Sequence, residues 1–173
     1  AILDFVELHP GGRVGLVTFA GQAFLQCPLT YDHQAFRESL LAADTHSIPV
    51  GGTDLGRAVN EALQAVEDPE HRQIMLLFSD GEDLAESART VAASLREQPA
   101  TIYTVGVGTL VGSEIPILNE QGKPDVLRDD VGRVVHTRLD EQTLRTLATA
   151  SGGRYQPLGA LGVVVRQPLV RLP

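Results

Sequence analysis

Residues 73–83 read QIMLLFSDGED, a near-continuous apolar run that ends in polar residues. A run of this kind is typical of a parallel strand that is covered by helices on both faces. In parallel sheets, the ligand crevice lies beyond the carboxyl ends of the strands. The sequence therefore predicts a functional site at the end of this strand, which Asp80 directly follows.

The segments on either side alternate between strand-like and helix-like patterns. Upstream, residues 13–20 and 23–30 are rich in β-forming residues and flank a tight turn at Gly21, which predicts an antiparallel hairpin. Downstream, residues 100–108 (ATIYTVGVG) predict a second buried strand, and 153–158 (GRYQPL) a final one. Together they predict an α/β domain with a mostly parallel sheet and an antiparallel edge. Helical spacing is found in residues 1–9, 31–43 with Asp32 as its cap, 54–67, 84–98 and 140–153.

Two regions depart from this alternation. Residues 110–137 are rich in Gly, Pro and charged residues, and we expect a long loop or small hairpin inserted after the strand at 100–108. Residues 159–173 contain three consecutive valines and two prolines, which disfavour a helix, so their conformation stays open. No composition shift marks a linker, and residues 1–173 are expected to form a single domain.

Composition excludes several classes of function. Hydrophobic residues make up 43% of the chain and charged residues 21%, as in an ordinary globular protein. The net charge of −8 argues against nucleic acid as a partner. Cys27 is the only cysteine, so an internal disulfide and a cysteine-rich zinc site are excluded, and we expect it to be a small buried strand residue. No run approaches the ~18 apolar residues of a membrane span, so the chain as given is expected to be soluble.

Two oxygen-bearing side chains are expected to point into the crevice. Thr53 lies in GGTDLG (residues 51–56) at a predicted helix start, and Asp80 lies at the strand end. Mg²⁺ prefers oxygen ligands at ~2.0–2.1 Å and keeps several waters, so a hydroxyl and a carboxylate suit it and no histidine is required. Each residue also has a simpler interpretation. Thr53 could be an N-cap contributing about 1 kcal/mol, and Asp80 a turn residue.

The pairing of GGTDLG with an apolar strand ending in SDGED resembles the von Willebrand factor A-type domain. In that family, a metal-ion-dependent adhesion site combines an Asp-x-Ser-x-Ser loop, a threonine at a helix start and an aspartate after a central strand. Thr53 matches this threonine, and Asp80 matches this aspartate. The resemblance implies a three-layer, Rossmann-like fold and metal-assisted binding of a partner carboxylate.

Four segments are similar to the bacterial Bat (aerotolerance) subgroup of this family: GGTDLGRAV, LLFSDGED, IYTVGVGT and RLDEQTLRTLATASGGRY. This resemblance implies a membrane-associated bacterial protein, with membrane contact only through segments outside residues 1–173. It also implies protein partners, either a MoxR-type AAA+ ATPase or other Bat-type proteins.

One departure from the family concerns the metal site itself. No Asp-x-Ser-x-Ser occurs in the 173 residues, which begin with Ala1 and contain Met75 as the only methionine. In the family this loop follows the first, central strand, so we expect a fragment whose missing strand and loop lie upstream of Ala1. Thr53 and Asp80 alone are too few to fix an octahedral ion, and we expect weak Mg²⁺ binding or none. Loss of a central strand, on the order of 10 kcal/mol, predicts marginal stability and an exposed strand edge.

Three functions remain open on the sequence. The leading hypothesis is a non-enzymatic module that binds a partner carboxylate through Mg²⁺. The alternative is a Mg²⁺-dependent phosphate-ester hydrolase or phosphotransferase using Asp80, for which we find neither a second catalytic carboxylate nor a phosphate cradle. The third is a scaffold with a degenerate metal site. Glu82 and Asp83 lack the spacing of a calcium loop and are expected to be solvated or near a helix start.

Overall fold

The computed structural model describes residues 2–44, 48, 50–66, 73–98, 100–119, 121–128 and 131–158. Its helices are α1 (Ile2–Glu7), α2 (His33–Ala42), α3 (Leu55–Gln64), α4 (Ala88–Ser94), continued by the 3₁₀ helix η1 (Leu95–Glu97), and α5 (Glu141–Ala150). Its strands are β1 (Val14–Phe19), β2 (Ala23–Thr30), β3 (Gln73–Ser79), β4 (Ala100–Gly106), β5 (Ser113–Glu114), β6 (Pro116–Leu118), β7 (Pro124–Val126), β8 (His136–Thr137) and β9 (Tyr155–Pro157).

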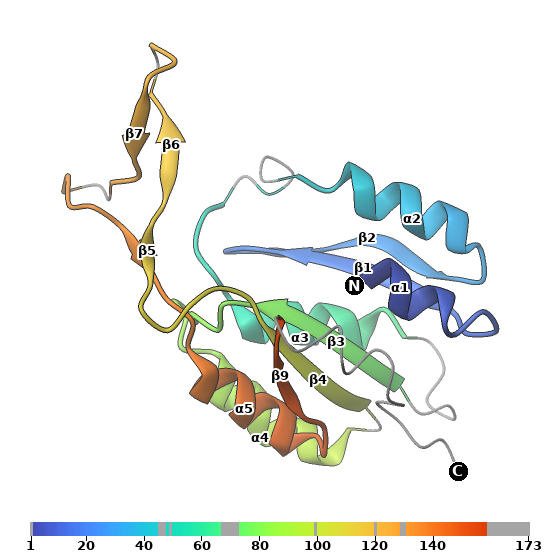
Figure 1. The fold of residues 1–173 in the computed structure, drawn as a ribbon. Helices are drawn as coiled ribbons and strands as arrows, with labels where there is room; N and C mark the ends of the chain where they lie inside the picture. Colours follow the sequence, from blue (N-terminus) through green and yellow to red (C-terminus); the bar gives the residue numbers. More distant parts are fainter. Residues whose placement is uncertain are drawn as a thin grey trace.

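The parallel sheet has the order β3-β4-β9 (Figure 1). Strands β3 and β4 pair in unbroken parallel register from Gln73 opposite Ala100 to Ser79 opposite Gly106. The short strand β9 adds to the other edge of β4, also in parallel. Strands β1 and β2 form a separate antiparallel hairpin. The predicted α/β architecture, with parallel strands and an antiparallel hairpin, is therefore confirmed.

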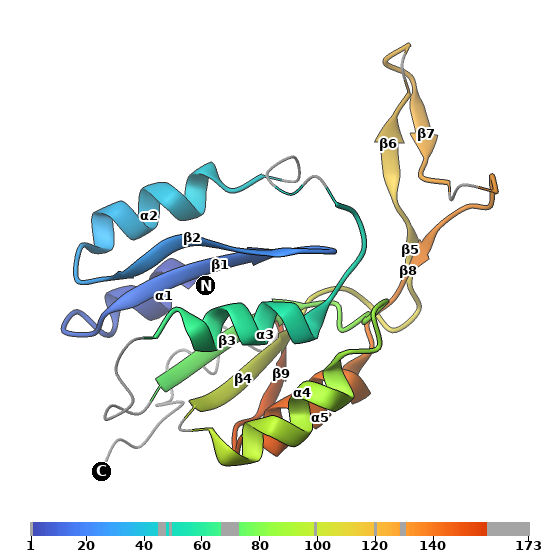
Figure 2. The same cartoon turned by 180° about the vertical axis from the view of Figure 1, so that it is seen from behind.

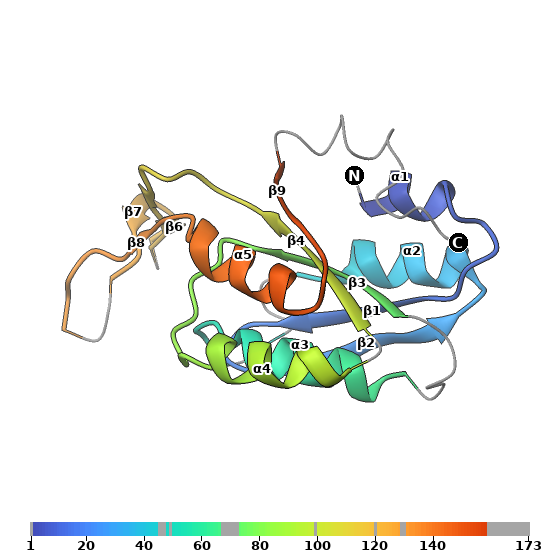
Figure 3. The ribbon, with the colours of Figure 1, turned by 90° about the horizontal axis from the view of Figure 1, so that it is seen from below.

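Helices cover both faces of these strands. Figure 3 shows α1 and α2 on one side of the β1-β2 hairpin and α3 and α4 on the other. Strand β1 contributes to both sides with period two, because Leu16 packs toward α1 and α2 whereas Phe19 packs toward α3 and α4. Cys27 is buried with Val6 and Phe36 in the smaller of the two cores, as predicted.

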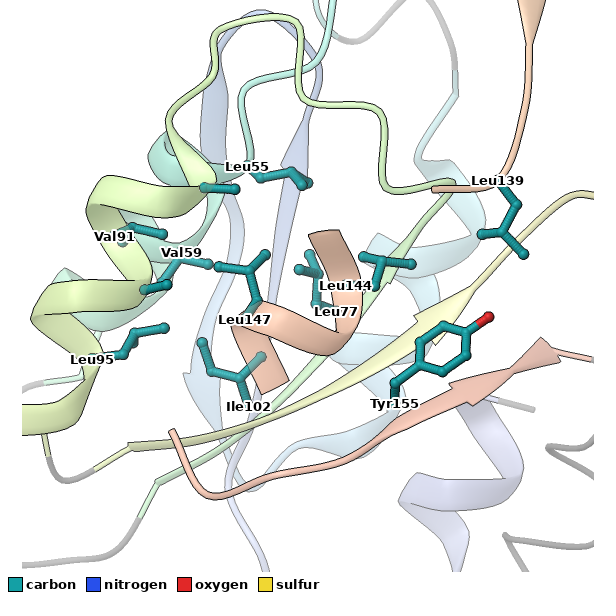
Figure 4. Packing of buried hydrophobic residues seen from close by; sticks show 12 residues of the cluster. Leu55, Val59, Leu77, Val91, Leu95, Ile102, Leu139, Leu144, Leu147 and Tyr155 are labelled. Atoms are coloured by element: carbon teal, nitrogen blue, oxygen red, sulfur yellow. The ribbon is translucent and has the colours of Figure 1, made fainter. Parts of the chain in front are cut away.

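The larger core lies between β3, β4, β9 and the helices α3, α4 and α5 (Figure 4). Leu55 and Val59 of α3, Leu144 of α5 and Ile102 of β4 are completely buried there. Burial of each such side chain contributes about 1.5–3 kcal/mol to folding. This core lies directly behind the carboxyl ends of β3 and β4 and fixes their positions.

The helix boundaries follow local capping. Asp32 caps α2, with its carboxylate accepting hydrogen bonds from the backbone N–H groups of Gln34 and Ala35 at 3.0 Å, so the predicted cap is confirmed. Asp140 caps α5 in the same way. Gly152, with φ of +78°, lies just beyond the end of α5, where a left-handed residue is favourable.

The helix predicted over residues 84–98 begins later than expected, at Ala88. The Asp83 carboxylate accepts a hydrogen bond of 2.7 Å from the Ala88 backbone N–H, and Glu86 has φ of +53°. A residue in that conformation cannot continue a right-handed helix. Residues 84–87 therefore form a turn, and Leu84 lies exposed on it.

Residues 110–137, here called the arm, project from the rest of the domain (Figure 2). Strands β5 and β8 pair at its base through Ser113 and Thr137, and β6 and β7 pair further out. The expected insertion is thus a hairpin. Strand β9 confirms the final strand predicted in 153–158, and the open question about 159–173 lies outside the described residues. Within the described ranges, none of the helices combines the length and the apolar character needed to cross a bilayer.

Candidate functional site

A cleft of about 460 Å³ opens at the carboxyl ends of β3 and β4. This is the edge of the sheet at which the sequence predicts a site. Both predicted site residues, Thr53 and Asp80, line it. The remaining lining residues come from the ends of β1 and β3, the loop before α3, the loop after β4, the base of the arm and the residues that follow it, namely Phe19, Ala20, Gly52, Phe78, Ser79, Val107, Gly108, Thr109, Ser113, Thr137, Arg138 and Leu139.

The loop that carries Thr53 is fastened to the turn between β1 and β2. The Asp54 backbone N–H donates to the Ala20 carbonyl at 2.9 Å, and the Gly21 N–H donates to the Val50 carbonyl at 3.1 Å. Gly21 also approaches this loop so closely that a Cβ there would collide with the backbone of residue 51. These contacts hold Thr53 at the cleft.

Thr53 is not the cap of α3. That position belongs to Asp54, whose Oδ1 accepts a hydrogen bond of 2.9 Å from the Arg57 backbone N–H. Within the described part of the chain, the Thr53 hydroxyl has no hydrogen-bond partner, although its carbonyl accepts one from the Ala85 N–H. The hydroxyl can therefore bind a ligand without giving up a structural contact.

Asp80 is held from both sides. Its Oδ2 accepts a hydrogen bond of 3.0 Å from the Thr137 hydroxyl, and its Oδ1 accepts one of 3.2 Å from the Glu82 backbone N–H. The second contact is the turn geometry that the simpler interpretation of Asp80 predicts. Each carboxylate oxygen can accept two bonds, so both retain capacity for a cation. Asp80 is thus a turn residue that also faces the cleft.

The three residues that follow the arm, 138–140, each donate a backbone hydrogen bond to a residue in or beside the cleft. The Arg138 backbone N–H donates to Glu82 Oε1 at 3.0 Å. The Leu139 N–H donates to the Thr109 carbonyl at 2.9 Å, and the Asp140 N–H donates to the Asp80 carbonyl at 2.7 Å. Glu82 is therefore bonded to the segment that follows the arm and is not simply solvated. Sequence analysis missed Thr137 and Arg138 as site residues, because only long-range pairing brings them to Asp80.

A second acidic network lies beside the cleft and joins the starts of α3 and α4. Ser87 Oγ accepts a hydrogen bond from the Gly56 N–H and lies 2.7 Å from Asp54 Oδ1 and 3.1 Å from Asp83 Oδ1. Asp83 also accepts bonds from the Leu55 and Ala88 N–H groups. The prediction that Asp83 lies near a helix start is therefore confirmed.

The acidity of Asp54 reflects this network. Burial alone would raise its pKa, but hydrogen bonds from the Arg57 backbone and the Ser87 hydroxyl, with the Arg57 guanidinium 3.0 Å away, outweigh burial. The pKa of Asp54 therefore lies below the ordinary value of 3.8. This carboxylate is committed to holding two helices in place.

The side chains in the cleft offer the type of ligand atom that a hard cation prefers. Thr53, Asp80 and Thr137 offer only oxygen atoms, which is the ligand type of Mg²⁺. They include one carboxylate, and Mg²⁺ is commonly held by one or two together with water. Across the described ranges, no group of three or more His, Cys, Asp or Glu side chains converges on a point. These residues therefore suit Mg²⁺ better than a thiolate- or imidazole-bound metal.

Comparisons with known proteins show what this chain is similar to. A family model described as "von Willebrand factor type A domain" matches residues 1–82. A UPF0353 protein of Mycobacterium tuberculosis (strain ATCC 25177 / H37Ra) is 28% identical over 167 residues, covering 85% of this chain. The chain spans 43% of the length of that relative.

Two solved structures match nearly the whole chain at a TM-score of 0.86. BatB from Bacteroides thetaiotaomicron is 28% identical, and the match covers 95% of this chain and 82% of that one. An aerotolerance-related membrane protein from Bacteroides fragilis NCTC 9343 is 27% identical, covering 99% and 85%. Proximal thread matrix protein 1 from the mussel byssus, solved with a zinc-occupied MIDAS motif, shares the fold at a TM-score of 0.67 and 17% identity, covering 97% of this chain and 38% of that one.

Proposed function

We propose that this chain, whose residues 1–82 match a von Willebrand factor type A domain model and which is similar to the Bat proteins, is a protein-interaction module whose cleft binds a partner carboxylate through Mg²⁺. The observation that supports this most directly is that Thr53 and Asp80, from two separate loops, line one cleft. By the sequence resemblance, they match the threonine and the aspartate of the family's metal site.

The division of roles among the residues supports the proposal further. Thr53 offers a hydroxyl that no helix uses, Asp80 offers the negative charge, and the Thr137 hydroxyl fixes the orientation of that carboxylate. A bound Mg²⁺ ion would supply the local positive charge that attracts a carboxylate to an otherwise acidic protein. The fold neighbour from mussel byssus carries zinc at its MIDAS motif, and magnesium is our assignment for this chain.

The partners and the location are also part of the proposal. We assign a MoxR-type AAA+ ATPase or another Bat-type protein as the source of the carboxylate. Similarity to an aerotolerance-related membrane protein supports placing the full-length protein at a bacterial membrane. Any membrane contact then involves segments outside residues 1–173.

The test uses the full-length protein with Thr53→Ala and Asp80→Ala. Each variant should weaken Mn²⁺ binding, followed by electron paramagnetic resonance, by at least about tenfold. Each should also reduce capture of a purified MoxR-type ATPase in the presence of Mg²⁺. Thr90→Ala and Asp125→Ala are matched controls, because both residues are exposed and neither lines the cleft. Unchanged Mn²⁺ affinity in both cleft variants contradicts the proposal.

The same proteins test the enzymatic alternative. Asp80 is the only carboxylate among the described residues that line the cleft, so no second acid or base is at hand for hydrolysis there. We therefore expect no turnover of p-nitrophenyl phosphate. Turnover that Asp80→Ala abolishes would favour the hydrolase instead.

A further inference from the structure

Arg138 occupies an unusual position at the mouth of the cleft. Its backbone is clamped to Glu82, and the residues on either side of it are bonded to Asp80 and Thr109. Its side chain lines the cleft yet lies in an exposed residue. In the described part of the chain, its guanidinium makes no hydrogen bond or ion pair, and only the more distant charge of Asp140 interacts with it. The backbone at Arg138 is thus held by hydrogen bonds, while its guanidinium is available to bind another molecule.

The charge of this group contrasts with that of the chain. The whole chain has a net charge of −8, yet Arg138 and Asp80 are the only charged residues among the described lining residues. The two side chains form no ion pair with each other, and the Asp80 carboxylate is bonded to Thr137 and to the Glu82 backbone. A planar guanidinium can bind a carboxylate through two parallel hydrogen bonds. Arg138 therefore gives the cleft a positively charged group that belongs to the protein itself.

Exposed apolar side chains lie in or next to the segments that line the cleft. Val107 lines the cleft and is 38% exposed. Leu110 and Val111 are 66% and 96% exposed, in the turn between the lining residues Thr109 and Ser113. Leu84 is 71% exposed on the turn that precedes α4. Exposed apolar side chains grouped around a cleft mark a surface that another molecule covers.

We propose that Arg138 is a second carboxylate-binding group of the cleft, and that the partner presents an acidic side chain flanked by apolar residues. Arg138 binds one edge of the carboxylate, and Val107, Leu110 and Val111 contact the flanking side chains. This inference rests on the proposed function, from which it takes the idea that the cleft binds a carboxylate of a partner protein. It adds the identity of a binding residue and the chemical character of the partner segment.

The test is fluorescence anisotropy with the full-length protein and three labelled peptides. Their central sequences are Leu-Leu-Asp-Leu-Leu, Leu-Leu-Asn-Leu-Leu and Ser-Ser-Asp-Ser-Ser, and each is titrated in Mg²⁺ and in EDTA. Arg138→Gln should weaken binding of the first peptide about tenfold in both buffers, as expected for loss of a charge-assisted contact. It should leave the weaker binding of the Asn peptide unchanged. Arg138→Lys should recover part of the affinity, and Arg96→Gln, an exposed arginine on η1, is the matched control.

The outcomes separate this inference from the proposed function. Equal affinity of Arg138→Gln and the unaltered protein for the Leu-Leu-Asp-Leu-Leu peptide overturns the role of Arg138. Equal affinity for the Ser-flanked peptide overturns the apolar character of the partner, and no binding of any peptide at about 1 mM overturns both. Binding that depends on Arg138 but is the same in Mg²⁺ and EDTA, and unaffected by Asp80→Asn, overturns the metal-dependent function and leaves the Arg138 site standing.

Discussion

The loop before α3 and the loop after β3 each contribute one residue to a structural pair, Asp54 and Asp83, and one to a cleft-lining pair, Thr53 and Asp80. Asp54 and Asp83 bind the backbone N–H groups at the starts of α3 and α4 and meet through Ser87. Their neighbours Thr53 and Asp80 line the cleft. Residues within three positions of each other in the sequence thus divide between holding the helices and facing the cleft. The hydrogen-bond partners of each side chain, more than its charge, distinguish the two roles.

The largest expected effect is on the pair that holds the helices. Asp83→Ala removes the acceptor for the N–H groups of Leu55 and Ala88, and should lower the free energy of unfolding by about 3 kcal/mol. Asp80→Ala is the matched control and should cost about 1 kcal/mol, because its contacts are at the edge of the cleft. Urea denaturation measures both. Equal losses of unfolding free energy in the two variants would mean that Asp80 holds the fold as strongly as Asp83.

A smaller effect is expected where α3 approaches this network. A Cβ on Gly56 would lie 2.6 Å from the Ser87 Cβ, so Gly56→Ala should displace Ser87 and cost about 2 kcal/mol. Gly51→Ala is the control, because a Cβ there meets nothing within 4 Å, and should stay within about 0.5 kcal/mol of the unaltered protein. Thermal denaturation compares them. A neutral Gly56→Ala would mean that the two helix starts are not tightly joined.

The dependence of stability on low pH should also report on the hydrogen bonds of Asp54 to Arg57 and Ser87. The folded-state pKa of Asp54 lies below 3.8, so its contribution to stability is fully present above that pH and is lost as the pH falls through the lowered pKa. Asp54→Asn cannot titrate. Its free energy of unfolding should therefore fall less between pH 4 and pH 2 than that of the unaltered protein. If the free energies of unfolding of the two proteins fall equally with pH, other carboxylates cause the loss of stability in acid. Asp140 is then the next residue to test, because its pKa is also lowered.

The smallest stability effect is expected at Thr53. Its hydroxyl has no partner in the described part of the chain, so Thr53→Ala should change the free energy of unfolding by less than about 0.5 kcal/mol. Asp54→Ala, one residue later, removes the cap and should cost about 1 kcal/mol. The same urea titration measures both. A larger loss at Thr53 than at Asp54 would assign the threonine a structural role.

Local patterns predicted most of the fold. The apolar run at β3 and the hairpin of β1 and β2 were visible in the sequence because burial and turn chemistry act over a few residues. Asp80 could be placed at the ligand-binding edge because it directly follows a predicted parallel strand, whereas Thr53 was paired with it through the resemblance to the von Willebrand factor A-type domain. The late start of α4 escaped prediction, because the Asp83 side chain captures the Ala88 N–H in place of a continuous helical turn.

The contribution of the arm to the site could not be read from the sequence. Thr137 and Arg138 reach Asp80 and Glu82 only through pairing between residues more than fifty positions apart. Nothing in the periodicity of residues 131–140 specifies such a contact. Likewise, Asp54 and Thr53 both qualify as caps by residue type, and only the backbone geometry decides between them.

The way in which the arm is fastened also determines where the molecule can tolerate change. Residues 137–140 bond to Asp80, Glu82 and Thr109 beside the cleft, whereas a Cβ on Gly122 at the distal turn would meet nothing within 4 Å. Length and sequence at that turn are therefore uncoupled from the geometry of the cleft. An epitope tag or spectroscopic probe inserted beside Gly122 would report on docking events without disturbing the residues that mediate them, and related proteins are free to vary there.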